Sequence, residues 1–146
     1  MELVVKSYKE LTIDELYEIL KVRCAVFIVE QNCPYLDVDE KDKRAMHVWL
    51  KDEQGIQAYC RVLEPGVTFD DVCIGRVISL KRRCGLGTEL LKAGIRVAKE
   101  VYSAEKIVIE AQLYAKPFYE LQGFVQSSDV FLEDGIEHIQ MVLECK

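Results

Sequence analysis

The chain has 146 residues, half of them hydrophobic, and a formal net charge of −6 at pH 7. This length suits one domain with a substantial core, and the negative charge argues against binding to nucleic acid or to an anionic membrane. No stretch approaches the roughly 20 apolar residues of a membrane-spanning helix, and the N-terminus does not resemble a signal peptide. We therefore expect a single cytoplasmic domain over residues 1–146, with no nucleic-acid or membrane partner.

The first third of the sequence predicts a strand, a helix and a loop. Residues 3–8 are rich in β-branched side chains, and Thr12 with Glu15 has the spacing of a capping box that opens a helix to about Glu30. Arg23 interrupts the apolar stripe of this helix, so its guanidinium needs a partner if it is buried, with Glu30 or Asp37 as candidates.

Residues 31–44 have mixed charge and no helical or strand period. Their aspartates do not fit the ligand spacing of an EF-hand calcium loop. We interpret the segment as a solvated surface loop, although a long loop in a small domain is also a place where a substrate site is found.

The rest of the chain predicts a β-hairpin (45–51 and 56–63), then a strand–helix–strand unit and a final strand pair. The unit consists of an apolar strand at 72–80, a helix to 102 and a strand at 106–111, which favours parallel pairing. Gly94 in that helix indicates close packing on a sheet. A short helix at 115–122 precedes strands at 124–131 and 137–143. The order predicts one mixed α/β domain.

The basic turn between the apolar strand and the long helix has the features of a phosphate site. The first N–H groups of a helix lack internal partners, and the helix dipole favours negative charge there. Gly85 and Gly87 allow close approach to the backbone, and Lys81, Arg82 and Arg83 add positive charge. The turn lacks the Gly-Lys-Ser/Thr ending of a Walker A loop and the third glycine of a Rossmann fingerprint. The alternative is an ordinary helix start.

The cysteines have irregular spacing, and neither they nor the two histidines fall at metal-ligand intervals. We interpret them as reduced thiols and expect no metal. Cys84 is the exception, because positive charge at a helix start favours the reactive thiolate. No histidine lies near it in the sequence to act as a base.

Two motifs carry a family resemblance. Arg82, Gly85 and Gly87 form an Arg-x-x-Gly-x-Gly pattern that resembles the acetyl-CoA pyrophosphate loop of the GNAT N-acetyltransferases. Downstream, residues 118–124 (Phe-Tyr-Glu-Leu-Gln-Gly-Phe) are similar to the aromatic-Tyr-x-x-x-Gly-Phe stretch after the fifth strand of that family.

The resemblance covers nearly the whole chain, and residues 23–37, 74–77 and 131–138 look like the ElaA-type subfamily. It implies a mixed central β-sheet flanked by helices, with a splayed fourth strand. The chain departs from the family in the connection at 79–81, which is short and has no proline.

The resemblance also implies direct transfer of an acetyl group from acetyl-CoA, as co-substrate, to a small-molecule or peptide amine. Backbone amides of residues 83–88 would hold the pyrophosphate, and the end of the fourth strand would bind the pantetheine arm and polarise the thioester carbonyl. The residues implied in acetyl-CoA binding are Val77, Ile78, Ser79, Arg82, Arg83, Cys84, Gly85, Leu86, Gly87 and Thr88.

Within the resemblance, Tyr119 is the implied general acid, because a tyrosine stays protonated at neutral pH. The alternative for Tyr119 is a core aromatic whose hydroxyl is hydrogen-bonded. Glu110 ranks first as the base, and a water chain is an alternative. The candidates for substrate binding, some of which are also alternatives as base or as ion-pair partners, are Glu30, Tyr35, Trp49, Glu133 and His138.

Other functions stay open at this point. A protein that binds acyl-CoA as a sensor without catalysis would have the same loop, and an O- or longer-chain acyltransferase would differ in pocket shape. Turnover of acetyl-CoA separates an enzyme from a sensor. The acceptor and the oligomeric state, a homodimer included, are also left open by the sequence.

Overall fold

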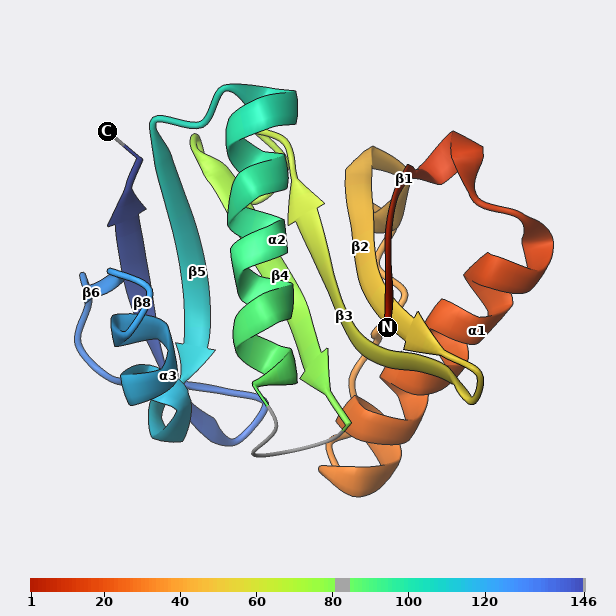
Figure 1. The fold of residues 1–146 in the computed structure, drawn as a ribbon. Coiled ribbons are helices and arrows are strands. Elements are labelled where there is room, and N and C mark those ends of the chain that lie inside the picture. Colours follow the sequence, from red (N-terminus) through yellow and green to blue (C-terminus); the bar gives the residue numbers. More distant parts are fainter. Residues whose placement is uncertain (81–84, 146) are drawn as a thin grey trace.

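The computed structural model of the protein describes residues 1–80 and 85–145. In this part of the chain, eight strands form one sheet with the order β1-β2-β3-β4-β5-β8-β6, and β7 also pairs with β8 (Figure 1). The pairing between β4 and β5 is parallel, and the other pairings are antiparallel. The strands are β1 (Glu2–Ser7), β2 (Ala45–Asp52), β3 (Gly55–Leu63), β4 (Val72–Ser79), β5 (Lys106–Gln112), β6 (Val125–Gln126), β7 (Phe131–Glu133) and β8 (Ile136–Glu144).

The described helices are α1 (Ile13–Arg23), α2 (Leu86–Tyr102) and α3 (Lys116–Glu120), together with the π-helix η2 (Cys24–Glu30) and the short 3₁₀ segments η1 (Tyr8–Glu10), η3 (Lys41–Arg44) and η4 (Leu113–Ala115). The predicted capping box is present at the start of α1. The Glu15 N–H donates to Thr12 Oγ1 at 3.1 Å, and the Thr12 N–H donates to Glu15 Oε1 at 2.9 Å. The first helical segment reaches Glu30 as expected, with π geometry in its second half. In the described chain, no helix has both the length and the apolar character needed to cross a membrane.

The two long helices lie on opposite faces of the sheet. Successive residues of a strand point to opposite faces. On one face, Val48 and Cys60 pack in a cluster with Leu90 of α2, and on the other face Trp49 and Tyr59 pack with Ile19 of α1. The mixed sheet flanked by helices is the predicted fold class, which the structure confirms.

Gly94 explains how α2 lies so close to the sheet. A Cβ at this position would lie 3.1 Å from Cys60 Sγ and 3.5 Å from Ile74 Cδ1. Gly costs about 1 kcal/mol relative to Ala in a helix interior. Close packing is therefore the reason for the glycine, as predicted.

The predicted strand at 124–131 is wrong in its extent, because the chain pairs with β8 only in the short segments β6 and β7. Between them the Gln140 N–H donates to Ser128 Oγ at 2.8 Å, and the Ser127 N–H donates to the Gln140 carbonyl at 2.8 Å. The serine hydroxyl thus takes the place of a backbone acceptor and interrupts the ladder.

Candidate active site

A cleft opens in the sheet where β4 and β5 separate. Their parallel register consists of the pairs Val72 with Ile107 and Cys73 with Val108. Beyond these pairs the strands diverge around a cleft of about 360 Å³, lined by residues 74–77 of β4 and 109–112 of β5. The splayed fourth strand is therefore confirmed, and it places a cavity at the carboxyl ends of two parallel strands, where ligands bind in many α/β proteins.

A β-bulge in β4 forms one wall of this cleft. Tyr59 of β3 pairs with Ile78 and Arg61 pairs with Gly75, so two residues of β4, Arg76 and Val77, lie opposite one residue of β3. Arg76 has φ +53°, in the left-handed region. Such an extra residue bends the strand and increases its local twist, which contributes to the separation of β4 from β5.

The bulge changes which face of the sheet the side chains occupy. Ile74 packs in the cluster under α2, whereas Ile78 packs in the cluster with Trp49 under α1. A regular strand would place residues four apart on the same face. The inserted residue therefore lets both isoleucines be buried.

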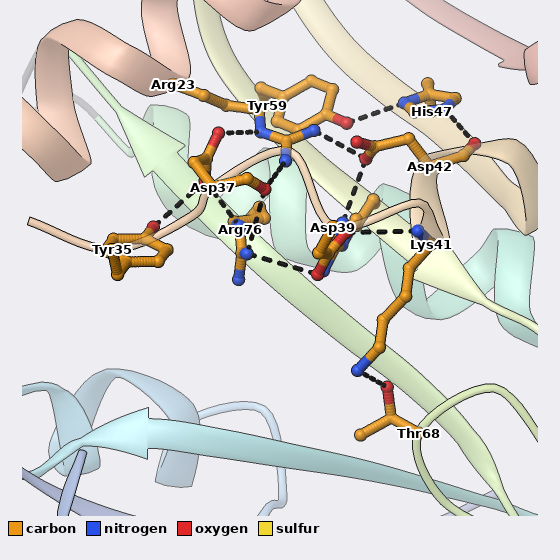
Figure 2. A network of polar contacts seen from close by, with 11 residues as sticks. Arg23, Tyr35, Asp37, Asp39, Lys41, Asp42, His47, Tyr59, Thr68 and Arg76 are labelled. Atoms are coloured by element: carbon orange, nitrogen blue, oxygen red, sulfur yellow. Dashed lines mark hydrogen bonds and ion pairs between the residues drawn. The ribbon is translucent and has the colours of Figure 1, made fainter. Parts of the chain in front are cut away.

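A network of charged side chains joins the loop at 31–44 to the bulge (Figure 2). Arg23 donates from Nε to Asp37 Oδ2 at 2.9 Å and from Nη1 to Asp42 Oδ1 at 2.6 Å. Arg61 donates from Nη1 and Nη2 to the two carboxylate oxygens of Asp39, both at 2.8 Å. These contacts fix the loop on the α1 face, against the wall of the cleft.

The network balances three arginines against three aspartates. Burial alone would raise the pKa of Asp39, but hydrogen bonds from Arg61 and the charge of Arg76 lower it to about 2. Burial likewise opposes ionisation of Asp42, and contacts with Arg23 lower its pKa. Within the described chain, Asp42 Oδ2 and Arg61 Nε have no hydrogen-bond partner.

His47 ends the network as a neutral base. Its Nε2 lies 2.9 Å from the Asp42 carbonyl and its Nδ1 lies 2.7 Å from the Tyr59 hydroxyl. Because a carbonyl only accepts, Nε2 carries the proton and Nδ1 accepts from Tyr59. Burial lowers the pKa of His47, which keeps it neutral.

Acidic and basic side chains meet on the opposite wall. Glu110 of β5 and His138 of β8 line the cleft. They lie on neighbouring antiparallel strands, where Glu110 pairs with Gln140 and His138 pairs with Gln112. His138 donates from Nδ1 to the Ile136 carbonyl at 2.8 Å, and its Nε2 lies 3.7 Å from Glu133 Oε2. Partial burial raises the pKa of Glu110, and the charge of Glu133 adds to the effect.

Tyr119 faces the cleft from α3. It is 9% exposed, and its ring packs edge-on against Phe118 and Phe124, with centroid distances of 5.0 and 5.8 Å. The residue lines the cleft, and its hydroxyl makes no hydrogen bond among the described residues. Burial raises the pKa of Tyr119, so the phenol keeps its proton. Tyr119 also belongs to the hydrophobic core under α2, so it is a core aromatic at the edge of the cleft.

Part of the predicted pyrophosphate loop, Lys81 to Cys84, lies outside the described residues. At its end, Gly85 has φ +75° and its carbonyl accepts from the Glu89 N–H at 3.0 Å, so it caps α2. A Cβ on Gly87 would lie 3.4 Å from Phe118 Cε1 and 3.5 Å from Ser79 Cβ. The two motifs found in the sequence therefore meet in space, beside the end of β4.

Several predicted residues gather at the cleft. Tyr35 lies in its wall, with its hydroxyl donating to Asp37 Oδ1 at 3.0 Å and its ring 5.4 Å from the Arg76 guanidinium. The other predicted residues that line the cleft are Val77, Glu110, Tyr119, Glu133 and His138.

Others do not line it. Trp49 is 2% exposed and packs in the core beside α1, so we do not retain it as an acceptor-binding residue. Glu30 is exposed at the end of η2 and is not among the described lining residues, although the adjacent Gln31 is. Ile78 has a buried side chain, Leu86 is in the core, and Thr88 is half-buried.

The sequence interpretation of residues 31–44 as a solvated loop holds for only part of the segment, because Asp37 and Asp42 are 6% and 5% exposed. Asp37 was foreseen as a partner of Arg23, but the roles of Asp39, Asp42 and Arg61 were missed. Arg61 could have predicted these contacts, because it is a cation in an otherwise apolar strand and a buried cation needs an anion nearby. The loop at 31–44, with its three aspartates, could supply that anion.

Comparison with known proteins shows that the fold is that of an acyltransferase. The acetyltransferase (GNAT) domain family matches residues 20–145. An acyl-CoA N-acyltransferase of Pseudomonas aeruginosa has a crystal structure similar to this chain, with a TM-score of 0.92, 34% identity and coverage of 98% of this chain and 99% of that one. The crystal structure of Escherichia coli ElaA is also similar, with a TM-score of 0.92, 33% identity and coverage of 98% of this chain and 99% of that one.

Curated relatives agree with this assignment. A UPF0039 protein of Schizosaccharomyces pombe is 38% identical over 99% of this chain and 97% of its own length. Protein ElaA of Escherichia coli is 36% identical over 94% of this chain and 92% of its own length. The chain therefore belongs to the GNAT acetyltransferase family, and its resemblance to ElaA is confirmed.

Proposed function

We propose that the protein is an acetyl-CoA-dependent N-acetyltransferase that acts on the amine of a small molecule or a peptide. The observation that carries the proposal is the position of Tyr119 in the lining of the cleft between two diverging strands, with no described hydrogen-bond partner for its hydroxyl. A donor held in this way suits protonation of a thiolate that leaves between β4 and β5. The P. aeruginosa relative described as an acyl-CoA N-acyltransferase supports the same class of reaction.

The direction of the β4 amides suggests how the thioester is held. The Leu80 N–H donates to the Gln57 carbonyl of β3 at 2.8 Å. Because N–H directions alternate along a strand, the Ile78 N–H also points toward β3, whereas those of Val77 and Ser79 point away from β3, and Val77 lines the cleft. We therefore favour Val77 and Ser79 over Ile78 for pairing with the pantetheine arm and polarising the carbonyl.

The phosphates of acetyl-CoA would lie at the start of α2. Gly85, Gly87 and Thr88 supply backbone N–H groups there, where the helix dipole favours an anion. Arg82, Arg83 and Cys84, in the undescribed part of the loop, complete the proposed pyrophosphate site by sequence.

In the proposed reaction, Glu110 takes a proton from the ammonium form of the acceptor. The free amine then attacks the thioester carbon and the C–S bond breaks as Tyr119 gives its proton to the sulfur of the leaving CoA. The excess proton on the newly bonded nitrogen passes to the Tyr119 phenolate, which leaves a neutral amide and restores the acid. A raised pKa suits Glu110 to this role, because a base works best when its pKa approaches the working pH. Tyr35, Glu133 and His138 form the acceptor side of the cleft in this proposal.

The test is acetyl-CoA turnover with a panel of amines, measured as free thiol released. In the Tyr119→Phe variant we expect a fall in kcat of about 100-fold, with acetyl-CoA affinity by calorimetry nearly unchanged. Tyr114→Phe is the matched control, because Tyr114 lines the same cleft but is 75% exposed. Binding of acetyl-CoA without turnover of any amine would instead favour an acyl-CoA sensor, and absence of binding would reject both.

A further inference from the structure

We propose that Arg76 is a positioning residue, whose contacts with Asp37 and Asp39 hold the β4 bulge in the conformation that turns the Val77 N–H toward the cleft. The link to catalysis rests on the proposed function, in which that N–H polarises the thioester. The bulge itself is a feature of the fold and can be tested separately.

The backbone of Arg76 is in an unfavourable region. Its φ of +53° is left-handed, a region that L side chains rarely occupy and that glycine enters without cost. The position is the extra residue of a bulge, where glycine is typical when φ is positive. Gly75 stands immediately before it and does not have a positive φ. Something other than local preference must hold this conformation.

The side chain of Arg76 supplies the restraint. Its Nε donates to Asp37 Oδ1 at 2.7 Å, and its Nη2 lies 3.2 Å from the Asp37 carbonyl and 3.4 Å from Asp39 Oδ2. Tyr35 lies against the guanidinium, with its ring centroid 5.4 Å from Cζ. The planar guanidinium is therefore fixed at several points, which a lysine cannot reproduce.

The two aspartates are fixed in turn. Asp37 also accepts from Arg23, which is fully buried on α1, and Asp39 accepts two hydrogen bonds from Arg61 on β3. The anchor of Arg76 is thus part of the core and not a mobile loop. Figure 2 shows Asp37 and Asp39 beside Arg76, and Asp37 beside Arg23.

The consequence for the site is the direction of the Val77 amide. In the described chain, Arg76 and Val77 have no register partner on β3 or on β5. The direction of the Val77 amide is therefore set by the peptide between residues 76 and 77, and hence by the dihedral angles at residue 76. The pairing on either side keeps the extra residue in place, but removal of the restraint would let this peptide rotate within the bulge and would turn the amide away.

A competing role for Arg76 is direct contact with the substrate, since it also lines the cleft. Substitutions distinguish the two roles. Arg76→Gly removes the charge but accepts a positive φ, Arg76→Asn tolerates it in part, and Arg76→Ala disfavours it. Arg76→Lys keeps the charge without the rigid fork.

If Arg76 has a positioning role, we expect kcat with acetyl-CoA to decrease from Arg76→Gly through Arg76→Asn to Arg76→Ala. Arg76→Gly should remain within about threefold of the wild type, and Arg76→Ala should lose about tenfold, as expected for a local conformational penalty of this kind. KM for the acceptor amine should change less than kcat. An Arg76→Lys enzyme that is more active than Arg76→Gly would overturn the proposal in favour of direct charge recognition.

A second measurement does not need activity. In ¹H–¹⁵N NOESY spectra we expect the pattern of sequential contacts between the Val77 N–H and residue 76 to be the same in Arg76→Gly as in the wild type, and to change toward that of an extended strand in Arg76→Ala. An unchanged pattern in Arg76→Ala would reject the inference about the bulge, whatever the enzyme does. Absence of turnover in the wild type, with the expected spectra, would reject the proposed function and leave the role of Arg76 in the bulge supported.

Discussion

Arg23 and Asp37 are joined at two points, from Nε to the carboxylate at 2.9 Å and from Nη2 to the main-chain carbonyl at 2.8 Å. Arg23 is fully buried and Asp37 is 6% exposed. A charge in such surroundings costs several kcal/mol unless it is paired and hydrogen-bonded. The pair therefore fixes the end of α1 to the loop that braces β4.

Removal of this arginine should destabilise the whole domain. In Arg23→Ala, Asp37 and Asp42 lose a buried partner, and we expect the free energy of unfolding to fall by about 3–5 kcal/mol in urea denaturation. Arg44→Ala is the control, because its ion pair with Glu64 is on the surface and should contribute less than about 1 kcal/mol. Equal losses in the two variants would contradict the importance of burial.

The network also predicts how stability responds to acid. The pKa of Asp39 is about 2 in the folded protein, against an ordinary value of 3.8. A carboxyl group with a lowered pKa stabilises the folded state at pH values above its ordinary pKa. This stabilisation is lost as the pH falls from about 4 to about 2. With allowance for solvent screening, we expect a loss of about 1–2 kcal/mol from this group. The measurement is the free energy of unfolding against pH, in the wild type and in Asp39→Asn.

The Asp39→Asn variant separates this group from the other carboxylates. Its free energy of unfolding should depend less on pH in that window than that of the wild type. Asp42, whose pKa is also lowered, should leave a residual slope. Parallel curves for the two proteins would show that Asp39 does not titrate as described.

Close packing of α2 on β3 predicts a coupling between Gly94 and Cys60. A methyl at position 94 would press on Cys60 Sγ, so Gly94→Ala should be destabilising despite its better helix propensity. Cys60→Ala removes the obstructing sulfur. We expect a coupling energy of about 1 kcal/mol between the two changes in a double-mutant cycle from urea denaturation. Simple additivity would contradict this account of the glycine.

The raised pKa of Glu110 predicts a pH dependence of the rate. A base must be deprotonated to act, so kcat/KM should fall as the pH drops below the pKa of Glu110, above the ordinary carboxyl value of 4.5. In Glu110→Gln, kcat should fall about 100-fold, and the decrease of kcat/KM at low pH (the acid limb of the pH profile) should disappear. The exposed Glu105→Gln is the control. If the limb persisted in Glu110→Gln and disappeared in His138→Gln, His138 would be the base.

Much of the fold could be predicted because it depends on local patterns. The capping box of α1 and the hairpin of β2 and β3 depend on residues a few positions apart, and the parallel pairing of β4 with β5 follows from the helix between them. The interruption between β6 and β7 was missed, because it depends on the contact of Ser128 with Gln140.

The site was only partly predictable for the same reason. Tyr119 and Glu110 were predicted by resemblance, and the structure places both at the cleft. The contacts of Arg61 with Asp39 and of Arg76 with Asp37 join residues 22 and 39 positions apart, and no local pattern connects them. The bulge at Arg76 was hidden as well, because arginine is an unusual residue at positive φ.

The divergence of β4 from β5 has a consequence for amide hydrogen exchange. The Val77 amide has no register partner on β3 or β5 in the described chain, and water can reach it when the cleft is empty. A pantetheine arm that pairs with β4 would act as a missing strand and complete the sheet across the gap. Slow exchange at Val77 would then appear only with acyl-CoA bound, while Ile78, which points toward β3, would be protected throughout.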